Sequence, residues 1–501
     1  MSRPLGGSLA LGIVLIGLGW SDADAQGYRL RLDSRAQRVT YRGVTADSVP
    51  VGQVITGPTG GPRAPGGFAV RCPPGSAYCF FFRPGDRLEG GPMVTTADLT
   101  LWGIGVRGLS ARVHGRLGLD LGDDDAWPGT DPAVQLVEGY AEYAHRRFTA
   151  RAGRQLLLSR LGIIGFDGAR ARARIGRSGL EADAYAGLGL ARTTALPVTS
   201  PALNPLDDFQ PRRRQLVAGG ALGYTGRLGD LRVEYQREVD RETRNFVSER
   251  AALTVDFRPV ERWSVAAGID YDLANSWVGN ADALVRYQTS WMTVAGGLRQ
   301  YRPHFDLWTI WGAFSPVPYH AVNTAVWVRP VRGVELRGRL ERYAFSNTET
   351  ETPLVDVDDD GWRLGVGASY SPSAAWRIDA GYREEYGPGA SSNGFEGSVT
   401  WLPTVTLSLT GYGSTLDRPL EFRFEDASVD VVGLDAEWRP ASHLQVAIGG
   451  ARYSEGRDRP DAAAFDWNQT RLHARVTLLF RSDADAVPLP PALRRPRVGV
   501  P

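Results

Sequence analysis

The sequence predicts an all-β protein: a transmembrane, antiparallel up-and-down β-barrel of about 22 strands, within a range of roughly 18 to 24. Runs of residues alternate between apolar and polar side chains, and the runs are about as long as a tilted strand that crosses a bilayer. Tight turns alternate along the chain with longer, irregular connections. The 60 glycines and 14 tryptophans suit a barrel with aromatic girdles better than a set of globular domains.

Residues 1–25 have the pattern of an export signal. Arg3 supplies a short positive region, Leu9–Leu18 is apolar, and Ala23-Asp24-Ala25 fits a cleavage site, so we expect the mature chain to begin at Gln26. The apolar run is too short for a spanning helix, and no other run approaches the roughly 18 residues required. The sequence therefore excludes a helical membrane protein.

Residues 26–90 form a segment rich in Gly and Pro with weak alternation. Cys72 and Cys79 lie close together after an export signal, so a local disulfide worth about 2–3 kcal/mol is expected rather than a metal site. The turn pattern requires one more crossing, which we place near Ala77–Arg83. A partial plug in the lumen is the alternative for this segment.

The clearest hairpin lies between residues 168 and 190. From Gly168 to Ile175, alanines alternate with arginines, and from Leu180 to Leu190 apolar residues alternate with polar or small ones. The turn Gly176–Gly179 separates the two runs. Successive side chains of a strand point to opposite faces, so each strand has an apolar and a polar side.

The barrel is predicted to span residues 91–480. Its short connections are Val106–Gly108, His145-Arg146, Gly176–Gly179, Thr225–Gly229, Arg258–Glu261, Gln288–Ser290, Arg329–Gly333, Ser371–Ala374, Leu402–Thr404 and Arg439–Ser442. The longer ones are Gly122–Pro132, Thr193–Arg212, Asp240–Thr243, Ala274–Gly279, Pro303–His320, Ser346–Asp360, Gly387–Ser392, Thr415–Asp426 and Glu455–Trp467. Tight periplasmic turns and longer external loops are typical of outer-membrane barrels.

Individual runs assign the two faces. Trp362–Tyr370, Trp263–Tyr271 and Trp376–Tyr382 each carry aromatic residues at both ends of one face, as expected at membrane interfaces. Arg471–Phe480 is the last strand, and its terminal Phe resembles the assembly signal of outer-membrane barrels. The Pro-rich tail 481–501 is predicted to be disordered.

Arginines gather on the predicted inner face of three neighbouring runs. Because adjacent strands lie about 5 Å apart, they are expected to form a row on one pore wall that attracts anions. The row consists of Arg112, Arg116, Arg151, Arg170, Arg172 and Arg174. The alternative is that these arginines pair with carboxylates and merely fill the wall; the candidates are Glu138, Glu142, Glu181 and Asp183.

Residues Pro303–His320 form the most apolar long connection. Its aromatic residues would not stay readily in water, so we predict that it folds into the barrel mouth and narrows it. These residues are Trp308, Trp311, Phe314 and Tyr319. The alternative is a surface loop that contacts lipopolysaccharide or a neighbouring chain.

Asp356, Asp358 and Asp360 match the first half of a calcium loop. The twelfth position would be Gly367, where a bidentate Glu is required. An acidic surface loop is therefore preferred to a weak calcium site, and no cofactor is expected.

A short motif pair resembles a known family. Gly153-Arg154-Gln155 and Phe166-Asp167-Gly168-Ala169-Arg170 are similar to the GRQ…FDG(A)R pattern of alginate-export-type outer-membrane porins. In that family an arginine-rich lumen passes an anionic polysaccharide. The resemblance covers roughly 20 residues and implies a channel for a solute, without identifying alginate.

These patterns favour a channel in the cell outer membrane for passive or weakly selective diffusion of small, possibly anionic, solutes. A barrel that serves as scaffold or sheath for a partner protein is the alternative, followed by an enzyme at the rim. The histidines show no metal-ligand or nucleophile pattern, so no enzyme is expected. About 65 residues before residue 91 are too few for the plug of a gated receptor. Expected partners are membrane lipid, lipopolysaccharide and the barrel-assembly machinery; no nucleic acid is expected.

Overall fold

The computed structural model describes the greater part of the chain. The described residues are 27–57, 60–122, 134–176, 178–190, 215–241, 244, 246–302, 319–346, 360–387, 391–420, 427–457 and 467–482. The predicted signal peptide, its cleavage site and the tail from residue 483 onward lie outside them. Among the described residues, no helix has the length and apolar character needed to cross a membrane.

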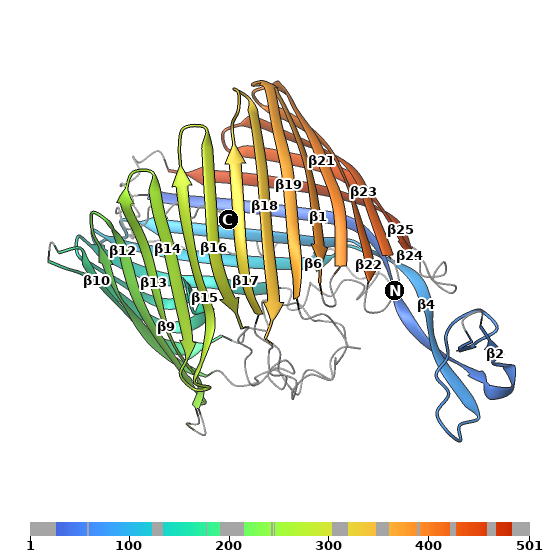
Figure 1. Cartoon of the computed structure of the whole chain (residues 1–501). Helices are drawn as coiled ribbons and strands as arrows, with labels where there is room; N and C mark the ends of the chain where they lie inside the picture. Colours follow the sequence, from blue (N-terminus) through green and yellow to red (C-terminus); the bar gives the residue numbers. More distant parts are fainter. Residues whose placement is uncertain are drawn as a thin grey trace, which may run out of the picture.

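The described strands build one large antiparallel sheet that closes on itself (Figure 1). It holds 23 strands. One of them, β4, pairs only with residues 39–50 of β1 and lies outside the ring, so the barrel itself has 22 strands. Residues 27–38 of β1 pair with β25 on one side and with β5 on the other, which closes the barrel. The predicted fold class is thus confirmed.

The elements follow the chain in sequence order. They are β1 (Gly27–Pro50), η1 (Val51–Gln53), β2 (Ile55–Thr56), β3 (Pro62–Arg63), β4 (Tyr78–Gly90), β5 (Pro92–Trp102), β6 (Leu109–Asp120), β7 (Val134–His145), β8 (Phe148–Ser159), β9 (Gly162–Ile175), β10 (Leu180–Gly189), β11 (Leu216–Thr225), β12 (Gly229–Val239), β13 (Phe246–Val260), β14 (Trp263–Asp272), β15 (Trp277–Gln288), β16 (Met292–Tyr301), β17 (Tyr319–Val328), β18 (Val334–Phe345), β19 (Asp360–Ser373), β20 (Trp376–Tyr386), β21 (Ser391–Thr404), β22 (Leu407–Leu420), β23 (Ala427–Ala441), β24 (Leu444–Arg457) and β25 (Trp467–Arg481).

The outer wall of the barrel is apolar. Side chains that the alternation assigns to it are exposed, among them Trp263, Ile269, Tyr271, Val366, Tyr370, Trp376, Ile378, Leu472, Val476 and Phe480. Aromatic rings meet across strands near the short turns, for example Trp376 stacked on Trp401 at 5.6 Å between centroids. Large apolar side chains on the convex face suit contact with hydrocarbon rather than water.

One external connection is as short as the turns at the opposite end. The sequence pattern places two short turns in succession, at residues 145–146 and 176–179. Strict alternation of short and long connections would require a long connection between them. The structure places a two-residue turn, Arg160-Leu161, at this position, between β8 and β9.

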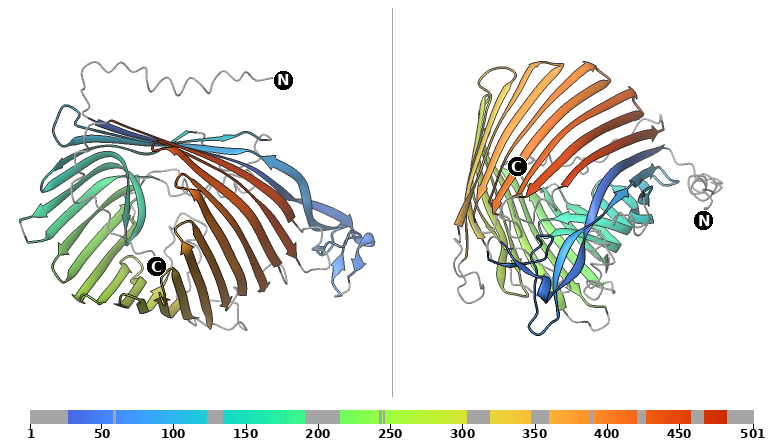
Figure 2. Two further views of the ribbon diagram at one scale, coloured as in Figure 1. Left: turned by 90° about the horizontal axis from the view of Figure 1, so that it is seen from above. Right: turned by 90° about the vertical axis from the view of Figure 1, so that its right-hand side faces the viewer.

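The first barrel strand is Gly27–Arg38, so the prediction of Ala77–Arg83 was wrong. Residues 39–50 of β1 continue past the rim and pair with β4, forming a two-stranded ribbon on the side of the long connections. The ribbon projects outside the ring in Figures 1 and 2. The described residues of this segment therefore do not plug the lumen.

The tip of the ribbon is a small lobe joined by the disulfide Cys72–Cys79. Its core contains Val49, Ala64 and Cys79, against which Phe68 and Phe81 pack. On the ribbon, Arg83 Nε donates to Asp47 at 2.8 Å, and this bond lowers the pKa of the Asp47 carboxyl below its usual value. The bond joins the two strands of the ribbon beyond the barrel rim.

Asp33 bridges the two chain-terminal strands of the barrel. Its carboxylate accepts a hydrogen bond from Arg475 Nε at 2.8 Å and from Thr477 Oγ1 at 2.9 Å, both on β25. The seam thus combines ladder hydrogen bonds with a charge-assisted side-chain cluster.

Candidate functional site: the lumen wall and the folded hairpin

The lumen face is fixed by the outward residues of each strand. On β12, exposed Val233 and Tyr235 lie on the outer wall, so Glu234 and Glu238 point inward. Strand register carries this assignment to neighbouring strands, because directly paired residues share a face.

All six arginines of the predicted row lie on the lumen face, and most of them are ion-paired. Arg112 contacts Asp98 at 2.8 Å and Glu138 at 3.2 Å. The other contacts are Arg151 with Glu142, Arg170 with Asp183, Arg172 with Glu181, Arg174 with Glu181 at 3.9 Å, and Arg116 with the Gln135 side chain at 3.4 Å. The geometry is that of the alternative interpretation, in which carboxylates neutralise the row.

Little cationic surplus remains on this wall. Asp183 and Glu142 are buried beneath their arginines, so these two pairs are shielded from water in the pore. Arg172 and Arg174 share one carboxylate, that of Glu181. Because the Arg174 contact is the longer one and its side chain is 45% exposed, Arg174 has the weakest neutralisation among the ion-paired members.

A second group of arginines is exposed to the lumen without ion pairs. Arg337 and Arg339 on β18 and Arg383 on β20 are exposed, and within the described part of the chain no carboxylate forms an ion pair with them. Asp379 on β20 accepts a hydrogen bond from Arg377 at 2.8 Å and also interacts electrostatically with Arg337. The sequence prediction missed these three residues.

Glycines on β19 make room for these side chains. Register places Arg337 opposite Gly367 and Arg339 opposite Gly365, and a Cβ added to either glycine would crowd the arginine. The guanidinium stems therefore lie across β19. The sequence did place Gly365 and Gly367 on the inner face, which is the signal that could have identified this patch.

The tip of the β8–β9 hairpin leaves the wall. Pairing of β8 with β7 ends at Arg154, and pairing of β9 with β10 ends at Phe166, whereas β8 and β9 pair with each other up to Ser159 and Gly162. Gly165 still accepts a backbone hydrogen bond from Leu190 at 2.8 Å, so residues 155–164 are the part without a neighbouring wall strand on either side, among the described residues.

A row of glycines marks the fold line. Gly153, Gly168 and Gly187 are directly paired across β8, β9 and β10. Gly153 has φ 125°, a conformation that side chains disfavour, and a Cβ on Gly168 would collide with the Ala186 carbonyl oxygen. The motif residues noted in the sequence therefore sit at the base of the hairpin.

The base is tied by polar contacts of the same motif. Arg154 binds Asp167 with two hydrogen bonds, Nε to Oδ1 at 2.7 Å and Nη2 to Oδ2 at 2.9 Å. Gln155, which is buried, donates from Nε2 to the Gly168 carbonyl oxygen at 3.3 Å. The motif has a structural explanation here, and resemblance to alginate-export porins is not shown.

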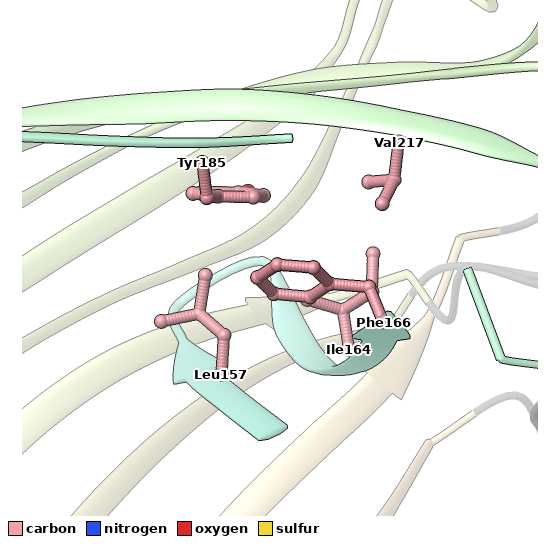
Figure 3. Close-up of a cluster of buried hydrophobic side chains, with 5 residues drawn as sticks. All are labelled: Leu157, Ile164, Phe166, Tyr185 and Val217. Carbon is pink, nitrogen blue, oxygen red and sulfur yellow. The ribbon is translucent and has the colours of Figure 1, made fainter. Parts of the chain in front are cut away.

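The hairpin tip folds against the inner wall (Figure 3). Leu157, Ile164 and Phe166 face Tyr185 of β10 and Val217 of β11, forming a buried cluster in which Phe166 is 0% and Val217 2% exposed. The Phe166 and Tyr185 rings lie 5.5 Å apart. Because Tyr185 and Val217 belong to the lumen face, the tip lies inside the barrel.

Arg160 anchors the turn further along the wall. Its backbone N–H donates to Glu234 of β12 at 3.0 Å, and its guanidinium contacts Asp282 of β15. A side chain on Gly268 of β14 would occupy the space of this guanidinium. The tip thus reaches across several strands and narrows the lumen where no constriction was predicted.

The predicted constriction loop falls largely outside the described residues: Trp308, Trp311 and Phe314 do so. Tyr319 is the first residue of β17 and belongs to a lumen-facing aromatic group with Tyr301, Tyr343 and Phe345. The Arg299 guanidinium lies 5.3 Å from the Tyr319 ring centroid. This arrangement forms a cation–π contact near the external mouth.

The calcium-like sequence cannot be assembled from the described residues either. Asp356 and Asp358 lie outside them, and Asp360 begins β19 with an ion pair to Arg342 at 2.6 Å. The described part of the chain contains no cluster of His, Cys, Asp and Glu that could hold a metal ion.

Comparison with known proteins identifies the fold. No family model and no curated protein matches the sequence. Solved structures do match. Two of them are mutants of the ferric enterobactin receptor PfeA from Pseudomonas aeruginosa, each 10% identical to this chain over 89% of its length. The mutant in complex with enterobactin has a TM-score of 0.52, with 81% of that chain covered. The other mutant has a TM-score of 0.51, with 80% of that chain covered. The outer membrane protein OpdK of the same organism matches over 91% of this chain and 99% of that one, at 10% identity and a TM-score of 0.37. The receptor likeness supports the barrel fold.

Proposed function

We propose that the chain forms an outer-membrane channel through which small solutes diffuse passively, with a weak preference for anions. The proposal rests on a closed barrel of 22 strands with an apolar outer wall. Within the described residues, three arginines of its lumen form no ion pair. An apolar belt requires hydrocarbon around it, and a polar lumen of this ring size leaves an aqueous path.

The anion preference is assigned mainly to Arg339 and Arg383, and to a lesser degree to Arg337, whose charge is partly offset by Asp379. A guanidinium whose charge is not cancelled by a nearby carboxylate attracts anions over about a Debye length, 8–10 Å at physiological salt. The ion pairs of the β6–β10 wall act as dipoles, and the field of a dipole decreases more steeply with distance than the field of a single charge. The six arginines of the predicted row therefore line the pore in this proposal, and among their ion-paired members Arg174 contributes most to its charge.

The remaining expectations belong to the same proposal. The chain is exported by its first 25 residues, inserted by the barrel-assembly machinery, and surrounded by lipid and lipopolysaccharide. It has no catalytic role. The structures of the ferric enterobactin receptor share the barrel fold at 10% identity, which is compatible with this location.

Conductance of the refolded mature chain tests the proposal. In a planar bilayer under a KCl gradient, we expect steady open channels with a reversal potential of the sign for anion selectivity. A folded barrel that carries no current would contradict a diffusion channel.

A scaffold role is the second candidate. The ribbon face formed by Tyr78, Phe80 and Phe82 is exposed, each side chain by at least half, and exposed aromatic rows are typical of contact surfaces. A silent barrel with a polypeptide that co-purifies through this ribbon, and is lost in Phe80→Ser/Phe82→Ser, would move this role to first place.

A further inference from the structure

The folded hairpin is apolar on both faces. Its wall side carries Leu157, Ile164 and Phe166 in the buried cluster. Alternate residues point the other way, and there Leu158 is 77% and Ile163 62% exposed, with Leu156 at 41%. Because the wall side rests on the inner surface of the barrel, the exposed side faces away from that wall, toward the lumen.

This exposure cannot be explained by membrane contact. Leucines and valines on the outer face of the barrel lack protein neighbours because lipid contacts them there. The hairpin tip, in contrast, lies over Tyr185 and Val217, on the inner side of the wall. Apolar surface facing water costs roughly 25 cal/mol per Å². We define Leu156, Leu158 and Ile163 as the lumen platform.

The platform is held in one orientation. The glycine row sets the fold line, the two-bonded Arg154–Asp167 pair fixes the base, and Arg160 fixes the turn to Glu234 and Asp282. A rigid apolar surface loses little conformational freedom when a solute contacts it, which favours binding.

The lumen also offers unpaired cations. Arg337, Arg339 and Arg383 are exposed on β18 and β20, and counted around the ring of 22, β19 stands ten strands from β9. The pore thus has an apolar surface on one side and a cationic surface on a nearly opposite side. This combination is complementary to a molecule with one apolar and one anionic part.

We propose that the lumen platform is a contact site for amphipathic organic anions, such as carboxylates that carry an aryl or short alkyl group. The inference rests on the proposed channel function and gives its solute class. The apolar part of the solute contacts Leu158 and Ile163 on one wall, and its carboxylate is attracted by the arginines of the other wall at a different point of its passage. Hydrophilic anions of equal charge gain only the second interaction.

The test compares phenylacetate with acetate as permeant anions. Reversal potentials of the mature chain are recorded in a planar bilayer with chloride on one side and either anion on the other. Phenylacetate diffuses more slowly in water, so an inert pore gives it the lower permeability. We expect the wild type to favour phenylacetate, and Leu158→Ser/Ile163→Ser to lower the phenylacetate-to-acetate ratio by about fivefold.

The matched control is Leu416→Ser. Leu416 lies on the lumen face of β22, opposite Gly394 and away from the hairpin, and its replacement should leave the ratio unchanged. Both platform side chains are mostly exposed, so their replacement removes no buried packing. An unchanged ratio in Leu158→Ser/Ile163→Ser, with normal chloride current, overturns the site and leaves the channel proposal intact.

A second measurement separates the site from the channel. Saturation-transfer NMR detects phenylacetate bound to the folded barrel in deuterated detergent, whether or not current flows. If the wild type is silent in bilayers, the channel proposal fails. A saturation-transfer signal lost in Leu158→Ser/Ile163→Ser then still supports the platform, and equal signals in both proteins overturn it.

Discussion

Two walls of the same lumen differ in how fully their arginines are ion-paired. On strands β6 to β10, guanidinium groups meet carboxylates: Arg170 lies against Asp183, and Arg151 against Glu142. On strands β18 to β20, Arg337, Arg339 and Arg383 extend over glycines or into the lumen without ion pairs among the described residues. The second wall also holds paired arginines, such as Arg363 between Glu341 and Glu385, but it adds three guanidinium groups that form no ion pair with any described residue.

A row of like charges on one strand face is therefore not enough to predict the electrostatic field in a pore. What counts is the residue that register places beside each charge. A paired arginine of the first wall mainly stabilises the strand contact, whereas an unpaired one of the second is available to a passing ion. The two walls should therefore respond differently to the same kind of substitution.

The largest expected effect is on stability. In Asp183→Ala, the partly buried Arg170 loses its carboxylate, and we expect the free energy of unfolding to fall by about 3–5 kcal/mol. In Arg339→Ala, no pair is broken, and we expect a change of at most about 0.5 kcal/mol. Urea unfolding in detergent, followed by tryptophan fluorescence, measures both. Equal losses would remove the distinction between the walls.

The fold line of the hairpin gives a medium effect. In Gly168→Ala, the new Cβ meets the Ala186 carbonyl oxygen, so the tip should lift from the wall, with a cost of about 1–3 kcal/mol and a higher single-channel conductance. Gly411→Ala is the control, because a Cβ at Gly411 meets nothing within 4 Å. Unchanged conductance in Gly168→Ala would argue against a hairpin that narrows the pore.

The smallest expected effect concerns the anchor of the tip. Arg160→Gln removes the guanidinium contact with Asp282, whose side chain is 47% exposed, while the backbone bond to Glu234 remains. Solvent screening limits the loss to about 0.2–1 kcal/mol. We expect normal mean conductance with larger current noise. A change in ion selectivity would show that Arg160 acts on ions directly.

Much of the fold could be predicted because alternation is local. The period of two placed Trp263, Val366 and Phe480 on the outer wall, and turn spacing gave a strand number near 22. The ribbon was missed because a sequence shows no boundary between the barrel half of β1 and its extension; the whole strand, Gly27–Pro50, is 24 residues long, over twice the length of one crossing.

The site was harder to predict because it depends on register and folding over. Sequence placed Arg112 and Arg170 inside the lumen, but their partners Asp98 and Asp183 are set by strand pairing. The hairpin tip left one signal, the loss of alternation in Leu156-Leu157-Leu158, where both faces are apolar. Such a run indicates that both sides of the strand are covered or used.

The measurement that tests the central claim most directly is the reversal potential of two charge variants under a KCl gradient. Arg337→Gln/Arg339→Gln/Arg383→Gln removes uncompensated charge, whereas Arg151→Gln/Glu142→Gln removes one pair and leaves the net charge unaltered. We predict that the first variant shifts selectivity toward cations and that the second keeps the wild-type value. The same value in the first variant as in the wild type, or a cation shift in the second, would contradict the account.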